Sequence, residues 1–297
     1  MNLFASDDEL FAKMRAGHSG YDVIVPTDQN VTRMAKAGLL LPLDHARIPN
    51  LANVAPAFLD PPYDRGRKYS MPYTTVITGI GYRKSKMPGG MVPDSWKWLF
   101  DSDQFHNRIA IPAGGVYLMQ LAAKYLGHSV NDIPDDMVAR IEAMLAKQVR
   151  AGNITAFHHD DGDSLLASGE VDIVAEANGD VAQKMLEDDD LAFVVPKEGS
   201  LIDDGCLCIP TDALHSDNAH SFINYVLDAK AGAEIARTIL YATPNAAAKA
   251  LMPASYCDNA VIFPPADQMA RCEYGDDLPP ARSQLYEEAI SRARLAK

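Results

Sequence analysis

The sequence contains no apolar run approaching the roughly 20 residues that span a bilayer, and it has no excess of basic residues. Its 27 Lys and Arg are outnumbered by 40 Asp and Glu, which gives a formal net charge of -13. Because nucleic-acid recognition needs a basic surface, we expect no nucleic-acid partner. The charge favours a cationic ligand only weakly, since whole-chain charge governs solubility and steering rather than one site.

Cysteine is scarce, with four residues among 297. Cys206 and Cys208 alternate on a strand-like stretch, so both point to one face and cannot easily bond each other. Cys257 and Cys272 have a spacing that leaves pairing open, and buried free thiols are the preferred interpretation for the cysteines. The cysteines therefore do not decide the compartment.

The amino terminus has no basic segment followed by an apolar one, which is the pattern of a secretory signal. Residues 1–4 lead at once into an acidic helix start, with Ser6 as the expected N-cap. Two interpretations stay open at this point. Either the protein is cytoplasmic, or the chain begins after processing or truncation.

Catalytic signatures are missing as well. The sequence has no Gly-x-Ser-x-Gly, no Walker loop and no Gly-x-Gly-x-x-Gly that opens a helix after a strand. Residues 158–163, His-His-Asp-Asp-Gly-Asp, are of the types that bind metal, but adjacent side chains diverge and no i, i+4 spacing completes a ligand set. We expect a solvated loop there, with Asp163 capping the next helix, and neither a metal nor a cofactor.

One pattern is present twice. Residues 20–28, Gly-Tyr-Asp-Val-Ile-Val-Pro-Thr-Asp, reappear in outline at 169–176, Gly-Glu-Val-Asp-Ile-Val-Ala-Glu. Each copy follows a helical segment and forms a short apolar strand, which is typical of a parallel sheet covered on both faces. Ligands of open α/β sheets lie beyond the carboxyl ends of strands, where Thr27, Asp28 and Glu176 are expected. The two copies predict two α/β lobes with a ligand cleft between them.

The rest of the chain is predicted from its apolar periodicity and turn residues. Residues 44–68 and 156–163 are expected to be connections, and the chain beyond 241 to be irregular until a final helix. Predicted strands lie at 23–25, 74–82, 108–111, 191–195 and 206–209, and residues 39–43 form a short apolar segment. Predicted helices lie at 6–16, 28–37, 116–126, 135–148, 181–186, 218–227, 230–239 and 283–296.

Two features at predicted strand ends are candidate binding groups. Residues 112–115, Pro-Ala-Gly-Gly, lead from a strand into a helix, so their N–H groups and the helix dipole favour an anion. A tight turn that only needs small residues is the slightly preferred alternative. Carboxylates such as Glu176, Asp203 and Asp204 would bind an ammonium group, although surface charge or helix capping is preferred for each one alone.

From Tyr21-Asp22-Val23-Ile24-Val25-Pro26 onward, the chain resembles the periplasmic polyamine-binding proteins of ABC importers. These are spermidine and putrescine receptors with the type II, two-lobed periplasmic fold. The resemblance covers nearly the whole chain, through residues 37–39, 69–73, 79–82, 177–181, 195–199, 209–210, 223–227, 241–245 and 285–288.

The resemblance also implies ligand residues, and this sequence keeps only part of the set. Thr27 matches a serine or threonine that follows Val-Pro, whereas Gln29 replaces an aromatic residue that packs on the polyamine. An acidic pair that holds an ammonium group corresponds to about Gly114 and Tyr117, so that anchor is lost.

The other implied contacts lie in the second half of the chain. A tryptophan before Asn-Gly-Asp is replaced by Ala177. A tryptophan and an aspartate align with Asp203 and Gly205, although Asp204 can supply the charge, and Tyr241 keeps an aromatic wall. A polyamine site needs aromatic faces for the methylenes and carboxylates for the ammonium ends, and several of both are missing.

The predicted architecture is an α/β, two-lobed periplasmic binding protein-like fold of type II, each lobe a central sheet flanked by helices. Lobe 1 would consist of residues 1–77 plus 205–249, lacking the family's first strand, and lobe 2 of residues 78–204 plus 250–297. The predicted ligand residues are Thr27, Asp28, Gln29, Gly114, Tyr117, Glu176, Asp203, Asp204 and Tyr241.

The predicted function is that of a monomeric, non-catalytic periplasmic receptor that delivers a polyamine or related small amine to ABC permease subunits in the membrane. The signal peptide is presumed to be processed or truncated. An alternative ligand is a zwitterion of the γ-aminobutyrate type, with its carboxylate on the Gly114–Gly115 turn and its ammonium on Glu176 or Asp204. A cytoplasmic enzyme or orphan binding domain on the same fold is less favoured.

Overall fold

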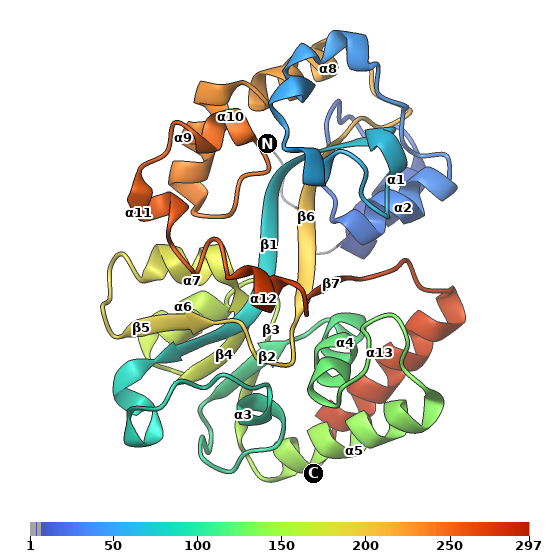
Figure 1. Ribbon diagram of the computed structural model, residues 1–297. Coiled ribbons are helices and arrows are strands. Elements are labelled where there is room, and N and C mark those ends of the chain that lie inside the picture. Colours follow the sequence, from blue (N-terminus) through green and yellow to red (C-terminus); the bar gives the residue numbers. More distant parts are fainter. Residues whose placement is uncertain (1–3, 5–6, 297) are drawn as a thin grey trace. The chain divides into compact units, whose positions relative to one another are not determined.

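The computed structural model describes residue 4 and residues 7–296, which form two compact units (Figure 1). Unit 1 comprises Met1–Val76 and Asp203–Asn259, and unit 2 comprises Ile77–Ile202 and Ala260–Lys297. The chain passes from one unit to the other within β1 (Ser70–Arg83), within β6 (Leu201–Cys208) and after Asn259. The boundaries expected after residues 77, 204 and 249 differ from these by one, two and ten residues.

Unit 1 is mainly helical. Its α-helices are α1 (Asp7–Ala16), α2 (Asp28–Lys36), α8 (Ser216–Val226), α9 (Ala229–Ile239), α10 (Ala246–Lys249) and α11 (Ala254–Cys257). The segment expected to be a plain connection at 44–68 instead contains four short 3₁₀-helices, η1 (His45–Arg47), η2 (Pro49–Asn53), η3 (Pro56–Phe58) and η4 (Arg65–Arg67). Proline at the first position of η2 and η3 explains the difference, because its fixed φ suits a helical turn.

The strand predicted at 23–25 was wrong as an extended strand, and the short apolar segment at 39–43 is not an extended strand either. Each segment forms a single antiparallel bridge, Ile24 to Cys208 and Leu40 to Pro210. Short apolar runs are difficult to assign by periodicity alone. Both runs nevertheless supply core residues, since Ile24 and Leu40 pack with α1 and α2 in one cluster around Cys206 and Cys208. A second cluster joins η2 and α8 over Leu207 and Ile209.

Unit 2 is built on a mixed sheet rather than the parallel sheet that the repeated pattern predicted. β2 (Ile109–Pro112) runs parallel to β3 (Ile154–His158) and to β4 (Ile173–Ala177), whereas the unit 2 part of β1 is antiparallel to β4 and to β5 (Leu191–Val194). The first residues of β6 pair in parallel with β7 (Glu273–Tyr274). The polar connection predicted at 156–163 was therefore partly wrong, because residues up to His158 complete a strand.

The helices of unit 2 are α3 (Lys97–Phe100), α4 (Gly115–Tyr125), α5 (Asp135–Arg150), α6 (Gly162–Ser168), α7 (Asn178–Lys184), α12 (Ala266–Met269) and α13 (Pro280–Arg294), with 3₁₀-turns η5 (Lys84–Lys86) and η6 (Pro88–Gly90). Helices α4, α5 and α13 lie side by side (Figure 1). The short elements α10, α11, α12 and β7 were missed in the stretch beyond residue 241, because two to four residues are too few to show a period.

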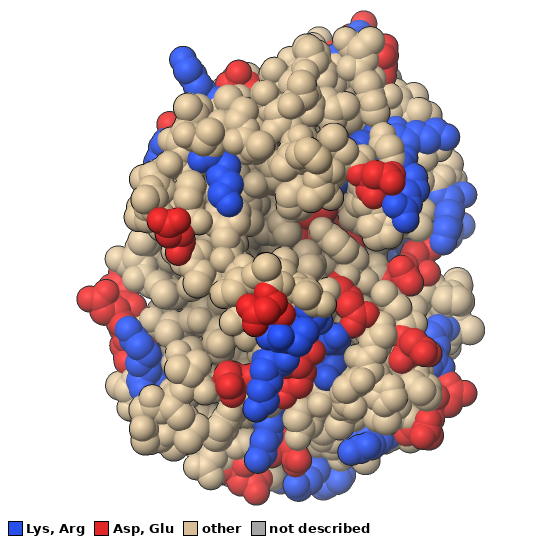
Figure 2. All heavy atoms as spheres, in the orientation of Figure 1, with Lys and Arg blue, Asp and Glu red and all other residues tan. Residues whose placement is uncertain are grey.

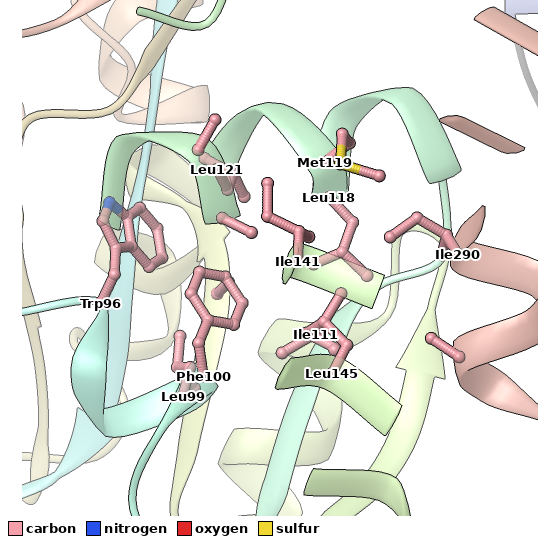
Figure 3. Packing of buried hydrophobic residues seen from close by; sticks show 14 of the residues in the cluster. Trp96, Leu99, Phe100, Ile111, Leu118, Met119, Leu121, Ile141, Leu145 and Ile290 are labelled. Atoms are coloured by element: carbon pink, nitrogen blue, oxygen red, sulfur yellow. The ribbon is translucent and has the colours of Figure 1, made fainter. Parts of the chain in front are cut away.

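The largest hydrophobic cluster lies in unit 2 (Figure 3). Trp96 is fully buried beside Phe100, with ring centroids 5.7 Å apart, and its indole N–H donates to the Gly199 carbonyl at 2.8 Å. Leu118 of α4, Ile141 of α5 and Ile290 of α13 converge on the same core. This packing fixes the position of α4, whose amino terminus follows β2.

The surface carries charges of both signs. Basic side chains lie among acidic ones on the face seen in Figure 2.

No helix in the described part of the chain combines the length and the apolar character needed to cross a bilayer. All four cysteines are free, and Cys206 and Cys208 are buried. The N-cap predicted at Ser6 lies outside the described residues.

Candidate functional site

Three carboxyl side chains meet at the start of α2 in unit 1. Thr27 has an extended backbone and forms an antiparallel bridge with Gly205, which places the first residue of α2, Asp28, against β6. The Asp204 N–H donates to Asp28 Oδ1 at 3.4 Å. Asp28 is fully buried, Asp204 is 1% exposed and Asp203 is 8% exposed. The structure therefore brings together four of the predicted ligand residues, Thr27 included.

Asp204 is held by three side chains and is the anion of a buried ion pair. Tyr63 Oη donates to its Oδ2 at 2.5 Å, Thr75 Oγ1 donates to its Oδ1 at 2.8 Å, and Arg67 Nη2 lies 3.5 Å from Oδ2. The Arg67 and Asp204 side chains are 1% and 0% exposed. Because these donors occupy both oxygens, Asp204 is fixed as a structural ion within unit 1.

The carboxyl group of Asp28 is hydrogen-bonded less completely than that of Asp204. Its Oδ2 has no hydrogen-bond partner among the described residues. Burial raises the pKa of the Asp28 carboxyl well above its usual range, and the charges of Asp203 and Asp204 raise it further. A cationic group beside Asp28 would oppose these effects, because it favours the ionised carboxylate.

Two other predicted residues, Gln29 and Tyr241, also belong to unit 1. Gln29 follows Asp28 in α2 and is half-buried. The carbonyl of Tyr241 accepts a hydrogen bond from Tyr256 Oη at 2.6 Å. Gly205 stands where the family resemblance implies an aspartate, and a Cβ atom there would lie 2.6 Å from Thr74 Cγ2. Tight packing against β1 thus excludes a larger residue at this position.

In unit 2, Glu176 pairs with a residue that the sequence analysis placed in solvent. His158, the last residue of β3, is 4% exposed, and its Nδ1 lies 3.6 Å from Glu176 Oε2. The Glu176 Oε1 accepts the Ala177 N–H at 2.8 Å. Gly162 opens α6 beside the pair, and a Cβ there would lie 2.3 Å from Glu176 Oε2 and 2.7 Å from the His158 ring. The solvated loop predicted for 158–163 was therefore wrong at both His158 and Gly162, which are buried.

Burial changes the proton affinity of both groups. It raises the pKa of the Glu176 carboxyl to about 8; the Ala177 N–H opposes this shift, and the charges of Asp180 and Asp163 add to it. Burial lowers the pKa of the His158 imidazole, against the smaller effects of the Ala175 carbonyl and of Asp161 and Asp160. The predicted helix-capping role of Asp163 does not occur, because α6 begins one residue before it.

The Gly114–Gly115 turn already has an anionic partner from its own unit. Gly114 is the N-cap of α4, and the Val116 N–H in the first turn donates to Glu287 Oε1 of α13 at 3.1 Å. A Cβ at Gly115 would lie 2.4 Å from Glu287 Oε2, so the glycine makes room for this carboxylate. Tyr117 of α4, which was also predicted as a ligand residue, hydrogen-bonds through its hydroxyl to Thr78 Oγ1 of β1.

Sequence reasoning missed several of the residues that define these sites. Tyr63 and Arg67 lie in the segment taken for a connection, and Thr75 lies in a strand where its partner was unknown. His158 was considered only as a metal ligand. No group of three or more His, Cys, Asp and Glu in the described part of the chain has a metal-binding arrangement.

The sequence matches the bacterial extracellular solute-binding protein family over residues 5–263. The chain belongs to this family. Curated relatives agree: it is 31% identical over 294 residues to the putrescine/cadaverine-binding protein of Pseudomonas aeruginosa, covering 93% of this chain and 80% of that protein. It is also 31% identical over 294 residues to spermidine/putrescine-binding periplasmic protein 1 of Haemophilus influenzae, covering 98% of this chain and 80% of that protein.

Solved structures show the same fold. A candidate spermidine/putrescine ABC transporter protein from Listeria monocytogenes superposes with a TM-score of 0.92 at 31% identity, covering 100% of this chain and 90% of that one. The spermidine/putrescine substrate-binding protein of Streptococcus pneumoniae gives 0.86 at 26% identity, covering 99% and 89%. The predicted family and the predicted two-lobed α/β fold are confirmed.

Proposed function

We propose that this solute-binding protein is the receptor of an ABC importer for a polyamine, such as putrescine or spermidine, or for a related small amine. The names of its relatives support this ligand class. In this proposal the protein acts as a monomer in the periplasm, hands its ligand to permease subunits and catalyses no reaction. Units 1 and 2 are the two lobes, and the predicted ligand cleft between the lobes stays a prediction.

The observation that best supports an amine ligand is the carboxyl cluster of Asp28, Asp203 and Asp204. Asp204 is already neutralised by Arg67, whereas the buried Asp28 keeps one oxygen without a hydrogen-bond partner in the described structure. A protonated amine would supply a positive charge and an N–H donor to this Asp28 oxygen. We therefore assign the ammonium contact to Asp28, with Asp203 beside it, rather than to Asp204.

The same geometry argues against the zwitterionic alternative. A ligand carboxylate at the Gly114–Gly115 turn would have to displace Glu287 from the Val116 N–H. It would also come close to that carboxylate, and like charges repel at short distance. A diamine has no anionic end and meets neither obstacle.

Calorimetric titration of the purified protein with putrescine, spermidine and γ-aminobutyrate tests the proposal. We expect binding of at least one polyamine. The Asp28→Asn substitution should weaken this binding by about ten- to a hundredfold, because it removes a charge-assisted hydrogen bond worth roughly 1.5–3 kcal/mol. Asp258→Asn, which removes an exposed carboxylate of unit 1, is the matched control and should bind normally.

Each result has a distinct meaning. Binding of γ-aminobutyrate without either polyamine would reject the proposed ligand class. Polyamine binding that Asp28→Asn leaves unchanged would keep the receptor function but move the ammonium contact away from Asp28.

A further inference from the structure

In the His158–Glu176 pair of unit 2, a hydrogen-bond acceptor of one side chain faces an acceptor of the other. His158 Nε2 lies 2.9 Å from the Ala175 carbonyl oxygen, which can only accept, so Nε2 must bear the ring proton. In the neutral imidazole, Nδ1 then has a lone pair, and it faces Glu176 Oε2 at 3.6 Å. Neither atom has another hydrogen-bond partner among the described residues. A second proton bound to either atom removes this conflict, because that atom then becomes a donor.

The pair is also well shielded from solvent. His158 is 4% exposed and Glu176 is 9% exposed, and Gly162 lets the start of α6 pack directly on both side chains. The charged groups around them are Asp163 of α6, which pairs with Lys184 of α7 at 3.4 Å, and Asp180 of α7. The exposed His159, Asp160 and Asp161 follow β3. Because acids outnumber bases here, the negative charge of an ionised Glu176 is disfavoured in the absence of a cation.

The position of the pair connects it with recognition. β2, β3 and β4 are parallel, so their carboxyl ends meet at one edge of the unit 2 sheet, where ligands of open α/β sheets bind. His158 is the last residue of β3 and pairs in register with Pro112 at the end of β2. Glu176 is the penultimate residue of β4.

We propose that His158 and Glu176 share one proton, and that a cation binding at this edge of the unit 2 sheet expels it. The nature of the cation rests on the proposed function, in which it is one ammonium group of the amine. With the proton the pair is neutral, and without it the pair has one negative charge that attracts the ammonium group. Amine binding is therefore accompanied by proton release, and it tightens as the pH rises.

Proton release is measured by calorimetry with putrescine at pH 7 in two buffers of different ionisation enthalpy. We expect release of up to one proton, and a Kd that falls by up to about tenfold per unit between pH 6 and pH 8. Alkyl ammonium groups stay charged over this range. Glu176→Gln should bind more weakly at pH 8, release up to one proton fewer and have a shallower pH slope, and any release that remains comes from Asp28, whose pKa is also raised. Glu187→Gln, which removes an exposed carboxylate just after α7, should keep both the proton release and the pH slope.

Putrescine binding without proton release in the unmodified protein, or an unchanged pH slope in Glu176→Gln, would overturn the proposal. The proton itself is observed without a ligand by following the ¹⁵N resonances of the His158 ring from pH 5 to pH 10. A shared proton predicts a Nδ1 inflection at neutral to basic pH that disappears in Glu176→Gln. The same titration curve in both proteins would overturn the shared proton. If no amine binds, the proposed function fails and the cation step fails with it, whereas the NMR titration still decides whether the proton is shared.

Discussion

The buried carboxyl groups of unit 1 are of two kinds, one fully paired and one not. Asp204 is matched by Arg67, Tyr63 and Thr75, and its task is to hold β6 to the neighbouring segments. Asp28 is equally buried but keeps an oxygen without a partner in the described structure. A buried carboxyl group with a raised pKa is typical of functional sites, since a bound cation can favour its ionised form. Sequence analysis treated both residues as equivalent ligand groups.

Arg67→Met is expected to destabilise the protein by about 3–5 kcal/mol, because removing one partner of a buried pair leaves the other charge uncompensated. The Arg67 side chain is 1% exposed. Urea denaturation measures the free energy of unfolding. The control is Arg65→Met: Arg65 is 69% exposed and pairs with Asp60, so its loss should cost less than about 1 kcal/mol. Equal losses for the two variants would show that Asp204 does not need its counter-ion.

Glu176 predicts a pH dependence of stability with a defined sign. Its pKa is about 8 in the folded protein against 4.5 as the ordinary value, so the folded state binds the proton more tightly. This stabilisation is complete below pH 4.5 and is lost as the pH rises toward 8, by at most about 1.4 kcal/mol per pH unit. In urea denaturation from pH 5 to pH 8, the stability of the natural protein minus that of Glu176→Gln should therefore fall.

His158 acts in the acidic part of this range. Burial lowers the pKa of its imidazole, so His158 destabilises the fold as the pH falls below its ordinary value, whereas the loss assigned to Glu176 continues up to about pH 8. Glu187→Gln should behave as the natural protein does. A stability difference that stays constant with pH would contradict a raised Glu176 pKa.

At the scale of elements, the amino terminus of α4 shows how a predicted anion site can be filled from within the protein. The glycines at 114 and 115 were correctly placed between a strand and a helix. Their role depends on α13, which begins 165 residues after Gly115 (280 − 115) and brings Glu287 to the Val116 N–H. Local sequence cannot indicate such a distant partner.

Gly115→Ala is expected to destabilise the protein by about 1–3 kcal/mol, as overpacking does. The added Cβ would lie 2.4 Å from Glu287 Oε2 and 2.9 Å from Glu287 Cα, so the backbone of α13 has to move. Gly114→Ala is the matched control, because its nearest neighbour would be Tyr117 Cβ at 3.6 Å, and it should change stability by less than about 0.5 kcal/mol. Thermal unfolding compares the two, and equal melting temperatures would contradict close packing at Gly115.

Long amphipathic helices and the central strand β1 were predictable because their apolar positions repeat over many residues. The mixed sheet could not be predicted, since an apolar run such as Ile173–Ala177 does not indicate whether its neighbouring strands run parallel or antiparallel to it. The buried end of β3 was missed for a related reason. His158 looks polar in sequence, and its burial follows only from Gly162 and Glu176, which the fold brings against it.

At the scale of the whole molecule, the family and the fold could be predicted because motifs along almost the entire chain matched. The ligand groups could not be predicted in the same way, because this sequence replaces most of the aromatic and acidic contacts that the family resemblance implies. Asp28 was predicted from its place after a strand alone, and only the Thr27–Gly205 bridge of the structure places it beside Asp203 and Asp204. A net charge of -13 adds a general attraction for cations that is separate from this cluster.

Salt distinguishes the two kinds of attraction. Exposed charges are screened over about 10 Å at 0.1 M ionic strength, whereas buried charges are screened much less. Because Asp28 is fully buried, we expect the Kd for putrescine to rise only a few-fold between roughly 0.05 and 0.5 M NaCl. Calorimetry measures this directly. Weak residual binding to Asp28→Asn should disappear over the same range, since only the diffuse surface charge remains to attract the amine. A rise of a hundredfold or more in the natural protein would place the amine on screened surface carboxylates instead of in the buried cluster.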